Sequence, residues 1–323
     1  MKITFSRLKE ELKRVLVANG FENEVAELCA RTFAENSGDG VHTHGLNRFP
    51  TFVRAVKEGL VNPSAEPERI SRMAALENWD GHLGPGISNA MHCMARAIVL
   101  ADEYGIGCVS IRNTNHWMRG GTYGWQAADA GFIGICFTNT IANVTPWGGT
   151  EPRLGNNPIV IAVPRTAGHI VLDMAVSQYS FGKMQEYRFR DEHLPFPGGY
   201  DSDGNISKDP AKIIKSQRAL PIGYWKGSGL SLLVDVLLTS LSGGRSTAAI
   251  TAGGAESGVS QCFIAIRPGL ENAALIEQIV DFTKSGHADQ VRYPGESTLS
   301  KRKEYLLGGI PVNEKIWNEV LNM

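Results

Sequence analysis

The sequence predicts an α/β protein in which a strand-rich middle lies between two helical ends. Apolar residues recur at helical spacing near the N-terminus, beginning with Phe5, Leu8 and Leu12. Short apolar runs of strand length fill the middle of the chain, and helical patterns return after residue 267. With 323 residues the chain is long enough for two domains. We expect the helical ends to pack together beside the α/β middle.

The composition is that of an ordinary globular protein. Hydrophobic residues make up 42% of the chain, charged residues 20%, and the formal net charge is -1. Without a basic excess, nucleic acid is not an expected partner. No apolar run reaches membrane-spanning length, so a membrane is not expected either. The five cysteines stand singly, which is typical of small core residues in a reducing compartment, and we expect a cytoplasmic protein without disulfides.

The opening helical part extends to residue 72 and contains three predicted helices. The first two follow the spacing of Phe5 to Leu16 and of Val25 to Phe33, and Gly20 separates them. The third is expected over 48–58, with Asn47 as its N-cap and Pro50 tolerated in its first turn.

The α/β part is assigned to residues 73–212 with a strand within 258–267, whereas 213–257 and 268–323 are assigned to helical segments that complete the helical domain. Its helices place apolar residues three or four positions apart, and its strands are short runs rich in Ile, Val and Phe. The elements expected after residue 72 are strands at 73–78, 108–111, 132–138, 159–163, 170–174 and 260–266, and helices at 88–104, 122–130, 230–241, 273–284, 300–307 and 313–321.

The stretch from Val41 to Pro50 has the composition of a site. It contains two imidazoles, His42 and His44, together with Arg48, directly after a glycine-rich turn. A helix N-terminus reinforced by Arg48 favours an anion beside His44, which would place a carboxylate clamp next to a proton donor. The alternative is that both histidines only cap and solvate a loop.

A glycine pattern after the first predicted strand resembles a dinucleotide fingerprint but does not complete it. Gly84 and Gly86 are followed by Asn89 where the third glycine should stand, and Pro85 stiffens the turn. The next strand ends in Arg112 rather than in an acid that would hold a ribose. We interpret the segment as a tight strand-to-helix turn.

Polar groups gather where the predicted strands end. His116 follows the strand at 108–111 and could polarise a carbonyl or serve the loop structurally. The loops at 138–140 and 154–158 are rich in small polar side chains that suit a polar ligand. Asp173 is a single acid in an apolar strand, where it could fix a histidine tautomer, hold a nicotinamide amide or form a buried ion pair.

Two later segments also carry polar signals. The stretch before the helix at 230–241 contains Trp225 and Lys226 among glycines, an arrangement that suits a stacking wall and a phosphate contact. The alternative is that Lys226 is only a solvated charge. The run at 201–205 begins like a calcium loop but lacks the closing glutamate, so we expect an exposed turn there.

Seven motifs occur in an order that resembles the malate/L-lactate dehydrogenase family, whose fold is not Rossmann-like. The similarity covers nearly the whole chain, and the family usually has serine where this sequence has Thr43. The motifs are His44-Gly45 with Arg48-Phe49-Pro50, Asn115 to Gly121, Tyr123-Gly124-Trp125, Leu154-Gly155-x-Asn157-Pro158, Leu172 to Ala175 with Ser177, Gly223 to Gly229, and Pro294-Gly295-Glu296.

The resemblance implies a non-Rossmann NAD-binding α/β domain with a mixed, largely antiparallel sheet. It implies reduction of a 2-keto acid, preferably a sugar acid, with NADH as cofactor, NADPH as the alternative, no metal, and a homodimeric enzyme. Of the implied catalytic residues, His44 is the proton donor and Arg48 holds the carboxylate, with His116 and Asp173 beside them. Arg119 is expected to add a donor for substrate hydroxyls. The implied cofactor contacts are His169, Ile170, Val171, Leu172, Asp173, Met174, Ala175, Trp225, Lys226, Gly295 and Glu296.

Three alternatives remain open from the sequence. The first is a malate, lactate or ureidoglycolate type of 2-hydroxy acid dehydrogenase within the same family. The second is a zinc hydrolase that uses His42 and His44 with His82 or His116. The third is a non-catalytic sugar-acid binding protein, because polar loops also serve binding without chemistry.

Overall fold

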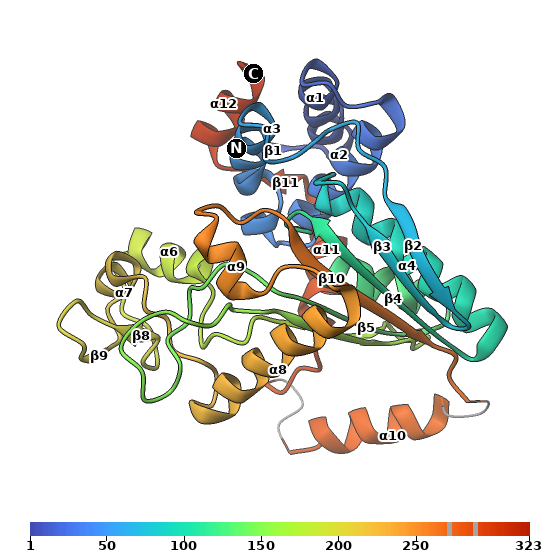
Figure 1. Cartoon of the computed structure of the whole chain (residues 1–323). Coiled ribbons are helices and arrows are strands. Elements are labelled where there is room, and N and C mark those ends of the chain that lie inside the picture. Colours follow the sequence, from blue (N-terminus) through green and yellow to red (C-terminus); the bar gives the residue numbers. More distant parts are fainter. Residues whose placement is uncertain (270–272, 287–289) are drawn as a thin grey trace.

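The computed structural model describes residues 1–269, 273–286 and 290–323, and a seven-stranded sheet forms its centre (Figure 1). The strand order is β2-β3-β4-β10-β5-β6-β7, in which β3 and β4 pair in parallel and the other neighbours pair antiparallel. The expected mixed, largely antiparallel sheet is confirmed. The strands are β2 (Glu68–Met73), β3 (Leu76–Asp80), β4 (Ile106–Thr114), β5 (Ile133–Thr138), β6 (Ile159–Val163), β7 (Ile170–Met174) and β10 (Val259–Ile266).

Helices cover both faces of this sheet because its central strand is apolar on both sides. In β10, Phe263 packs against α4 (Gly86–Tyr104) and α5 (Gly121–Asp129), while Cys262 faces α8 (Trp225–Ser242). The side chains of α8 that meet the sheet include Val234 and Leu238. We assigned residues 213–257 to the helical domain. In the structure α8 instead packs its apolar residues against the sheet.

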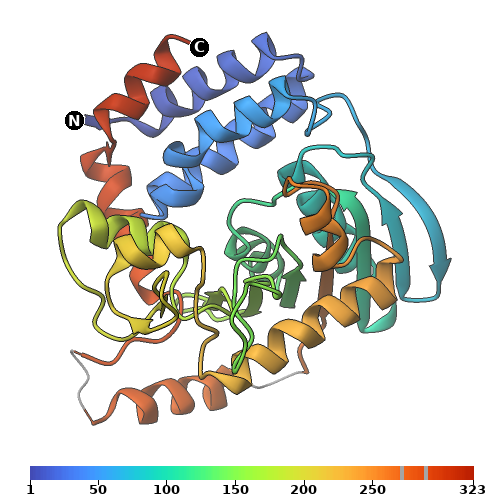
Figure 2. The ribbon, with the colours of Figure 1, turned by 60° about the vertical axis from the view of Figure 1, so that its left-hand side comes forward.

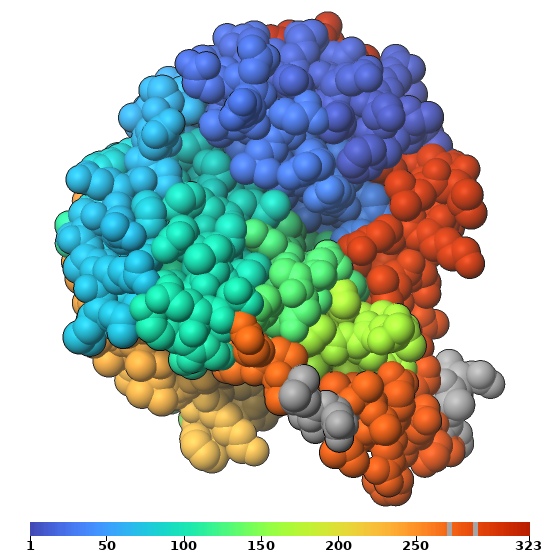
Figure 3. All heavy atoms as spheres, turned by 90° about the vertical axis from the view of Figure 1, so that its right-hand side faces the viewer, coloured from blue at the N-terminus to red at the C-terminus, as the bar shows by residue number. Residues whose placement is uncertain are grey.

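The two chain ends form one helical domain, as expected. The α1 and α2 helices (Phe5–Ala18 and Asn23–Gly38) pack with α3 (Phe49–Lys57) around Phe33, whose ring meets Phe49 edge-on at 5.2 Å between centroids. The C-terminal part adds α11 (Glu296–Gly308) and α12 (Glu314–Leu321), and β1 (Lys2–Ile3) pairs with β11 (Ile310–Pro311). Figure 3 shows the red C-terminal segment against the blue N-terminal helices.

The start of α3 differs from the expectation that Asn47 caps it. Two short 3₁₀ turns, His42–His44 and Leu46–Arg48, precede the helix, and Arg48 occupies the N-cap position without a side-chain hydrogen bond. Gly45 joins the turns because a Cβ at that position would overlap the Ser37 hydroxyl. The Ser37 Oγ accepts a hydrogen bond from the Leu46 N–H at 2.9 Å, which holds the histidine turn against α2.

The sequence did not predict several polar helices and strands. Strand β2 begins inside the segment 1–72 assigned to the all-helical opening. Every one of its residues is exposed, so the sequence shows no alternation of buried and exposed residues that would predict a strand there. The expected turn at 201–205 is confirmed, since the Asp201 side chain accepts hydrogen bonds from two following N–H groups. The other unpredicted elements are α6 (Phe181–Phe189), α7 (Pro210–Ser216), α9 (Thr247–Ala252), β8 (Gly199–Tyr200) and β9 (Ile206–Ser207).

The helix α10 (Ala273–Lys284) has the expected bounds but not the expected position. Figure 2 shows α10 at the lower edge of the molecule, whereas the helical domain lies at the upper edge. A two-point ion pair between Arg165 and Glu277, at 2.7 and 2.6 Å, joins it to the segment after β6. Segment 268–323 therefore divides between the helical domain and the sheet side of the molecule.

Candidate active site

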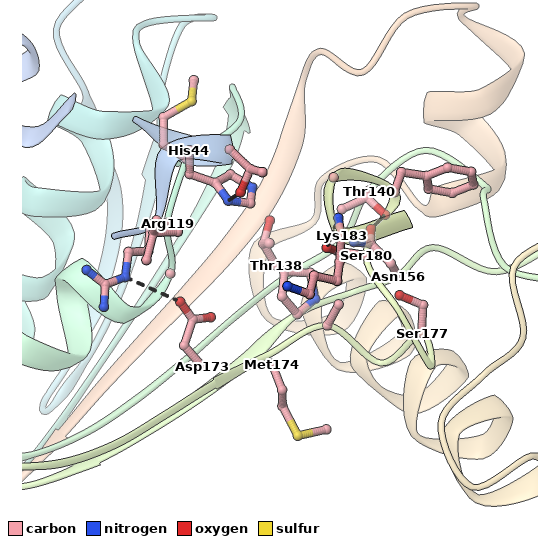
Figure 4. A pocket seen from close by; sticks show the side chains of 18 of the residues that line it. His44, Arg119, Thr138, Thr140, Asn156, Asp173, Met174, Ser177, Ser180 and Lys183 are labelled. Carbon is pink, nitrogen blue, oxygen red and sulfur yellow. Dashed lines mark hydrogen bonds and ion pairs between the residues drawn. The ribbon is translucent and has the colours of Figure 1, made fainter. Parts of the chain in front are cut away.

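A cleft of about 1140 Å³ lies between the helical domain and one end of the sheet. The histidine turn contributes one wall, and the strand ends and the starts of α6 and α11 contribute the others. This volume exceeds the range of about 300–1,000 Å³ that is typical of pockets for one small ligand, so the cleft has room for a dinucleotide together with a small acid. Figure 4 shows His44 facing a group of polar side chains across this cleft.

His44 and His116 stack inside the cleft. Their ring planes differ by 10° and their centroids are 5.6 Å apart. The Nδ1 atom of His116 accepts a hydrogen bond from the Met118 N–H at 3.0 Å, so the neutral ring carries its proton on Nε2. Burial, with Arg48 and Arg119 nearby, lowers the pKa of His44 to about 4. Burial and Arg48 also lower the pKa of His116, so both rings are neutral at pH 7 in the free protein.

Arg48 lines the cleft beside the two histidines, where the sequence placed it. Glu256, from the loop between α9 and β10, lines the same region and was not anticipated. Burial raises the pKa of Glu256 to about 7, against the opposing effect of Arg48. No local pattern in the sequence connects Glu256 with Arg48, because about 200 residues separate them and the tertiary fold alone brings them together.

Asp173 belongs to a charged network rather than to a histidine pair. Its carboxylate accepts a hydrogen bond from the Gly121 N–H at 2.8 Å and lies 3.9 Å from the Arg119 guanidinium, the pair drawn dashed in Figure 4. The protein atoms that crowd this carboxyl raise the pKa of Asp173 despite these two contacts, although the residue stays open to solvent in the cleft. Of the interpretations open from the sequence, the ion pair with a helix N-terminus is the one that these contacts support.

Arg119 lies at the wall of the cleft and is held there by two partners. Its side chain is 6% exposed, and its guanidinium binds Asp39 at 2.5 Å and Thr298 at 3.4 Å. Arg302 of α11 binds the same Asp39 carboxylate through two contacts of 2.7 and 2.8 Å. Arg119 therefore joins the loop after β4 to α2 and α11. These contacts use two of the five N–H donors of the guanidinium, and the side chain lines the cleft, so its contact with a substrate hydroxyl stays a prediction.

The polar loops contain residues with structural contacts and residues that line the cleft, and Asn139 is both. The Asn139 amide binds Asp235 and the Arg245 carbonyl, and the Asn157 amide binds Ser231, so both hold α8 or its C-terminal loop in place. Thr140 and Asn156 instead face the cleft, where the Thr140 hydroxyl donates to Asn156 at 2.9 Å. Figure 4 shows them with Ser177 and Lys183, opposite His44.

The residues expected to bind the cofactor do not all meet in this cleft. Val171 to Ala175 and Gly295 line it, and Gly295 is the left-handed residue that starts α11 at φ 95°. His169 lies outside, between the Arg165 N–H and the Asp129 carboxylate, and its neighbour Ile170 is also not in the lining.

The other three expected contacts also point elsewhere. Glu296 forms an ion pair with Lys284 at 2.6 Å. Trp225 is 67% exposed, and Lys226 lies over its ring at 6.0 Å, both outside the cleft lining. Trp225 and Lys226 therefore lie at the exposed start of α8, and their contact with the cofactor stays a prediction.

The two histidines of the zinc alternative face different neighbours. The His42 ring lies 6.0 Å from the Tyr305 ring, whereas the His44 ring stacks on His116. In the described ranges, which exclude 270–272 and 287–289, there is no group of three His, Cys, Asp or Glu side chains placed to hold a metal ion.

The sequence matches the family described as malate/L-lactate dehydrogenase over residues 3–321. The chain belongs to the malate/L-lactate dehydrogenase family. It is therefore an oxidoreductase that uses a nicotinamide nucleotide and acts on 2-hydroxy acids or the corresponding 2-keto acids. Within the described residues, no helix combines the length and the apolarity needed to cross a membrane.

Two curated members of this malate/L-lactate dehydrogenase family are similar over 99% of both chains. They are the 2,3-diketo-L-gulonate reductases of Citrobacter koseri, 44% identical, and Escherichia coli, 43% identical. Among solved structures, malate dehydrogenase from Entamoeba histolytica has a TM-score of 0.92 at 26% identity, covering 100% of this chain and 96% of that one. Sulfolactate dehydrogenase from Methanocaldococcus jannaschii has a TM-score of 0.88 at 29% identity, covering 99% and 95%.

Proposed function

We propose that this protein reduces a 2-keto sugar acid with NADH, most simply 2,3-diketo-L-gulonate to 3-keto-L-gulonate. The observation that carries the proposal is the stacked pair His44 and His116 beside Arg48 in one large cleft. The substrate itself comes from the two full-length relatives, which are named for that reaction.

The chemistry needs a hydride, a proton and a fixed carboxylate. The bound nicotinamide supplies the hydride for the C2 carbonyl carbon. Arg48 holds the substrate carboxylate by two parallel hydrogen bonds, and His44 gives a proton to the carbonyl oxygen as charge develops there. The Nε2–H of His116 stabilises the same oxygen, because its Nδ1 atom is already an acceptor.

The free edge of β7 suits the nicotinamide amide. Strand β7 is last in the sheet order, and its Val171 N–H points outward, donating to the Pro294 carbonyl at 2.9 Å. Because backbone direction alternates along a strand, Asp173 directs its backbone N–H and C=O to that same side. These groups match a carboxamide, and the cleft also holds an Asn143 side-chain oxygen that has no hydrogen-bond partner within the described chain.

The test is the loss of reduced nicotinamide absorbance with 2,3-diketo-L-gulonate, pyruvate and oxaloacetate, each with NADH and with NADPH. We expect the highest kcat/KM for 2,3-diketo-L-gulonate with NADH, and no effect of a chelator. A higher kcat/KM with pyruvate or oxaloacetate would favour the alternative 2-hydroxy acid dehydrogenase. A higher value with NADPH would overturn the proposed cofactor preference.

Arg48→Lys should weaken substrate binding and turnover together. Lysine keeps the charge but loses the planar two-point contact, so we expect kcat/KM to fall by the equivalent of about 1.5–3 kcal/mol. Steady-state kinetics with the keto acid varied gives this value. An unchanged KM for the keto acid would show that Arg48 does not bind the carboxylate.

We expect kcat/KM to depend on pH in the direction of keto acid reduction. In the free enzyme the pKa of His44 lies at about 4, so the protonated form decreases tenfold per pH unit above it. We therefore expect kcat/KM for reduction to fall from pH of about 5 to about 8, whereas kcat/KM for oxidation, which needs the neutral ring, stays constant. A constant value for reduction together with a falling one for oxidation at low pH would place the pKa of His44 near or above 7 instead.

We propose that the protein is a homodimer. The outer face of α8 exposes Leu232, Leu233, Val236 and Leu237, and α10 exposes Ile279 and Phe282. Figures 1 and 2 show both helices on the side of the molecule away from the helical domain. Such contiguous apolar surface is uncommon on monomers.

Light scattering of the wild-type protein and of Leu233→Asp with Leu237→Asp tests this assembly. We expect a dimer for the wild type and a monomer for the double variant, because two charges in an apolar interface are costly to bury. A wild-type monomer with full activity would contradict the proposed dimer.

A further inference from the structure

Glu256 has a position that the chemistry above does not use. The loop that carries it, between α9 and β10, is fixed to the helical domain by Ser257, whose hydroxyl donates to the Leu60 carbonyl at 3.1 Å. This contact places Glu256 where the helical domain meets the sheet. The loop thus holds a carboxyl group at a defined point of the cleft, next to Arg48.

A side pocket of about 70 Å³ opens beside the main cleft at this point. Arg48, His116, Met118 and Glu256 line both spaces, so the two adjoin at these residues. The remaining wall of the side pocket is mainly apolar and comes from Phe52, Ala55, Leu60 and Val61. The pocket has room for a few groups of the size of a water molecule.

The Glu256 carboxyl has no partner of its own. Within residues 1–269, 273–286 and 290–323 it forms no hydrogen bond and no ion pair, and Arg48 is the charged group that acts on it. The Glu256 side chain is half-buried in the wall of the cleft, and a carboxyl group that is free of protein partners at such a place often contacts a ligand.

We propose that Glu256 is a specificity-determining residue that binds a hydroxyl group on the substrate carbon chain beyond C2. This inference rests on the proposed function, because it takes the substrate carboxylate to lie on Arg48 and the carbonyl oxygen beside His44. The chain beyond C2 then enters the side pocket, with its C–H groups on the apolar wall and a hydroxyl donating to the Glu256 carboxylate.

Above pH 7, where the Glu256 carboxyl is ionised, its charge disfavours a second carboxylate in the side pocket. A dicarboxylic keto acid such as oxaloacetate would bring its distal carboxylate toward Glu256, where like charges in a partly buried site repel. Glu256 therefore selects in two ways: it favours a hydroxylated chain by a hydrogen bond, and it rejects an acidic chain by repulsion.

The experiment compares kcat/KM of the wild type, Glu256→Gln and Glu256→Ala for three keto acids. These are 2,3-diketo-L-gulonate, 2-oxohexanoate, which has the same chain length without hydroxyls, and oxaloacetate. We expect Glu256→Ala to lower the value for 2,3-diketo-L-gulonate by about 10–100-fold, the range of a hydrogen bond to a charged group. The value for 2-oxohexanoate should change by less than about threefold, and that for oxaloacetate should rise in both variants.

Glu58→Gln, at an exposed position after α3, removes a surface carboxylate and serves as the matched control, with no expected change in these ratios. Glu256→Gln keeps the volume of the side chain, so it tests the charge in a protein that folds normally. Equal losses for all three acids, or an unchanged ratio between them, would overturn the inference while the reductase activity stands. If the wild-type protein reduces none of the three with NADH or NADPH, the proposed function itself is wrong.

Discussion

His44→Ala should lower kcat for keto acid reduction by about 100-fold or more while leaving cofactor affinity nearly unchanged. Loss of a positioned general acid typically costs about 10²–10⁴ in rate. The His44 ring faces the cleft and stacks on His116, so its removal takes the proton donor from the reacting carbonyl but leaves the β7 edge intact. Steady-state kcat and the dissociation constant of NADH, measured on the same preparation, separate the two effects.

His42→Ala is the matched control for this variant. His42 lies in the same 3₁₀ turn, but its ring faces Tyr305 and does not line the cleft. We expect its kcat to remain within about twofold of the wild type. If both histidines only cap a loop, both variants should lose stability and keep activity in the folded fraction. Full activity in a folded His44→Ala protein would show that His44 is not the proton donor.

Asp39→Ala should destabilise the protein by about 3–5 kcal/mol, because it leaves a buried guanidinium without its partner. The Asp39 and Arg119 side chains are 5% and 6% exposed. Asp39 is also the point where α2, the loop after β4 and α11 meet, since Arg302 binds it as well. Urea unfolding followed by circular dichroism gives the free energy of unfolding.

Glu304→Ala is the control for this charge removal. Glu304 pairs with Lys301 on the exposed side of α11, where both side chains are about half exposed, and such pairs contribute about 0–1 kcal/mol. We expect a correspondingly small change in the free energy of unfolding. If Asp39→Ala changes it as little as Glu304→Ala does, then the network around Arg119 does not hold the domains together.

Periodicity predicted most of the fold because the buried elements are amphipathic or continuously apolar. The strands β6 and β7 and the helix α10 have the predicted bounds, and the helical ends pack together around Phe33 and Trp317. The exposed strand β2 and the polar helix α6 were missed, since neither carries an apolar stripe that distinguishes it from a loop.

The sequence by itself determined the helical ends, the strand-rich middle and the absence of a dinucleotide fingerprint, and it singled out His44 and Arg48, which line the cleft. These depend on local patterns, in which neighbours along the chain share one element. The side of the sheet that α8 covers, the partner of Asp173 and the meeting of Glu256 with Arg48 were decided by the tertiary structure alone. Those contacts join residues tens to hundreds of positions apart, and a single sequence carries no local signal of which distant side chains will share a cleft.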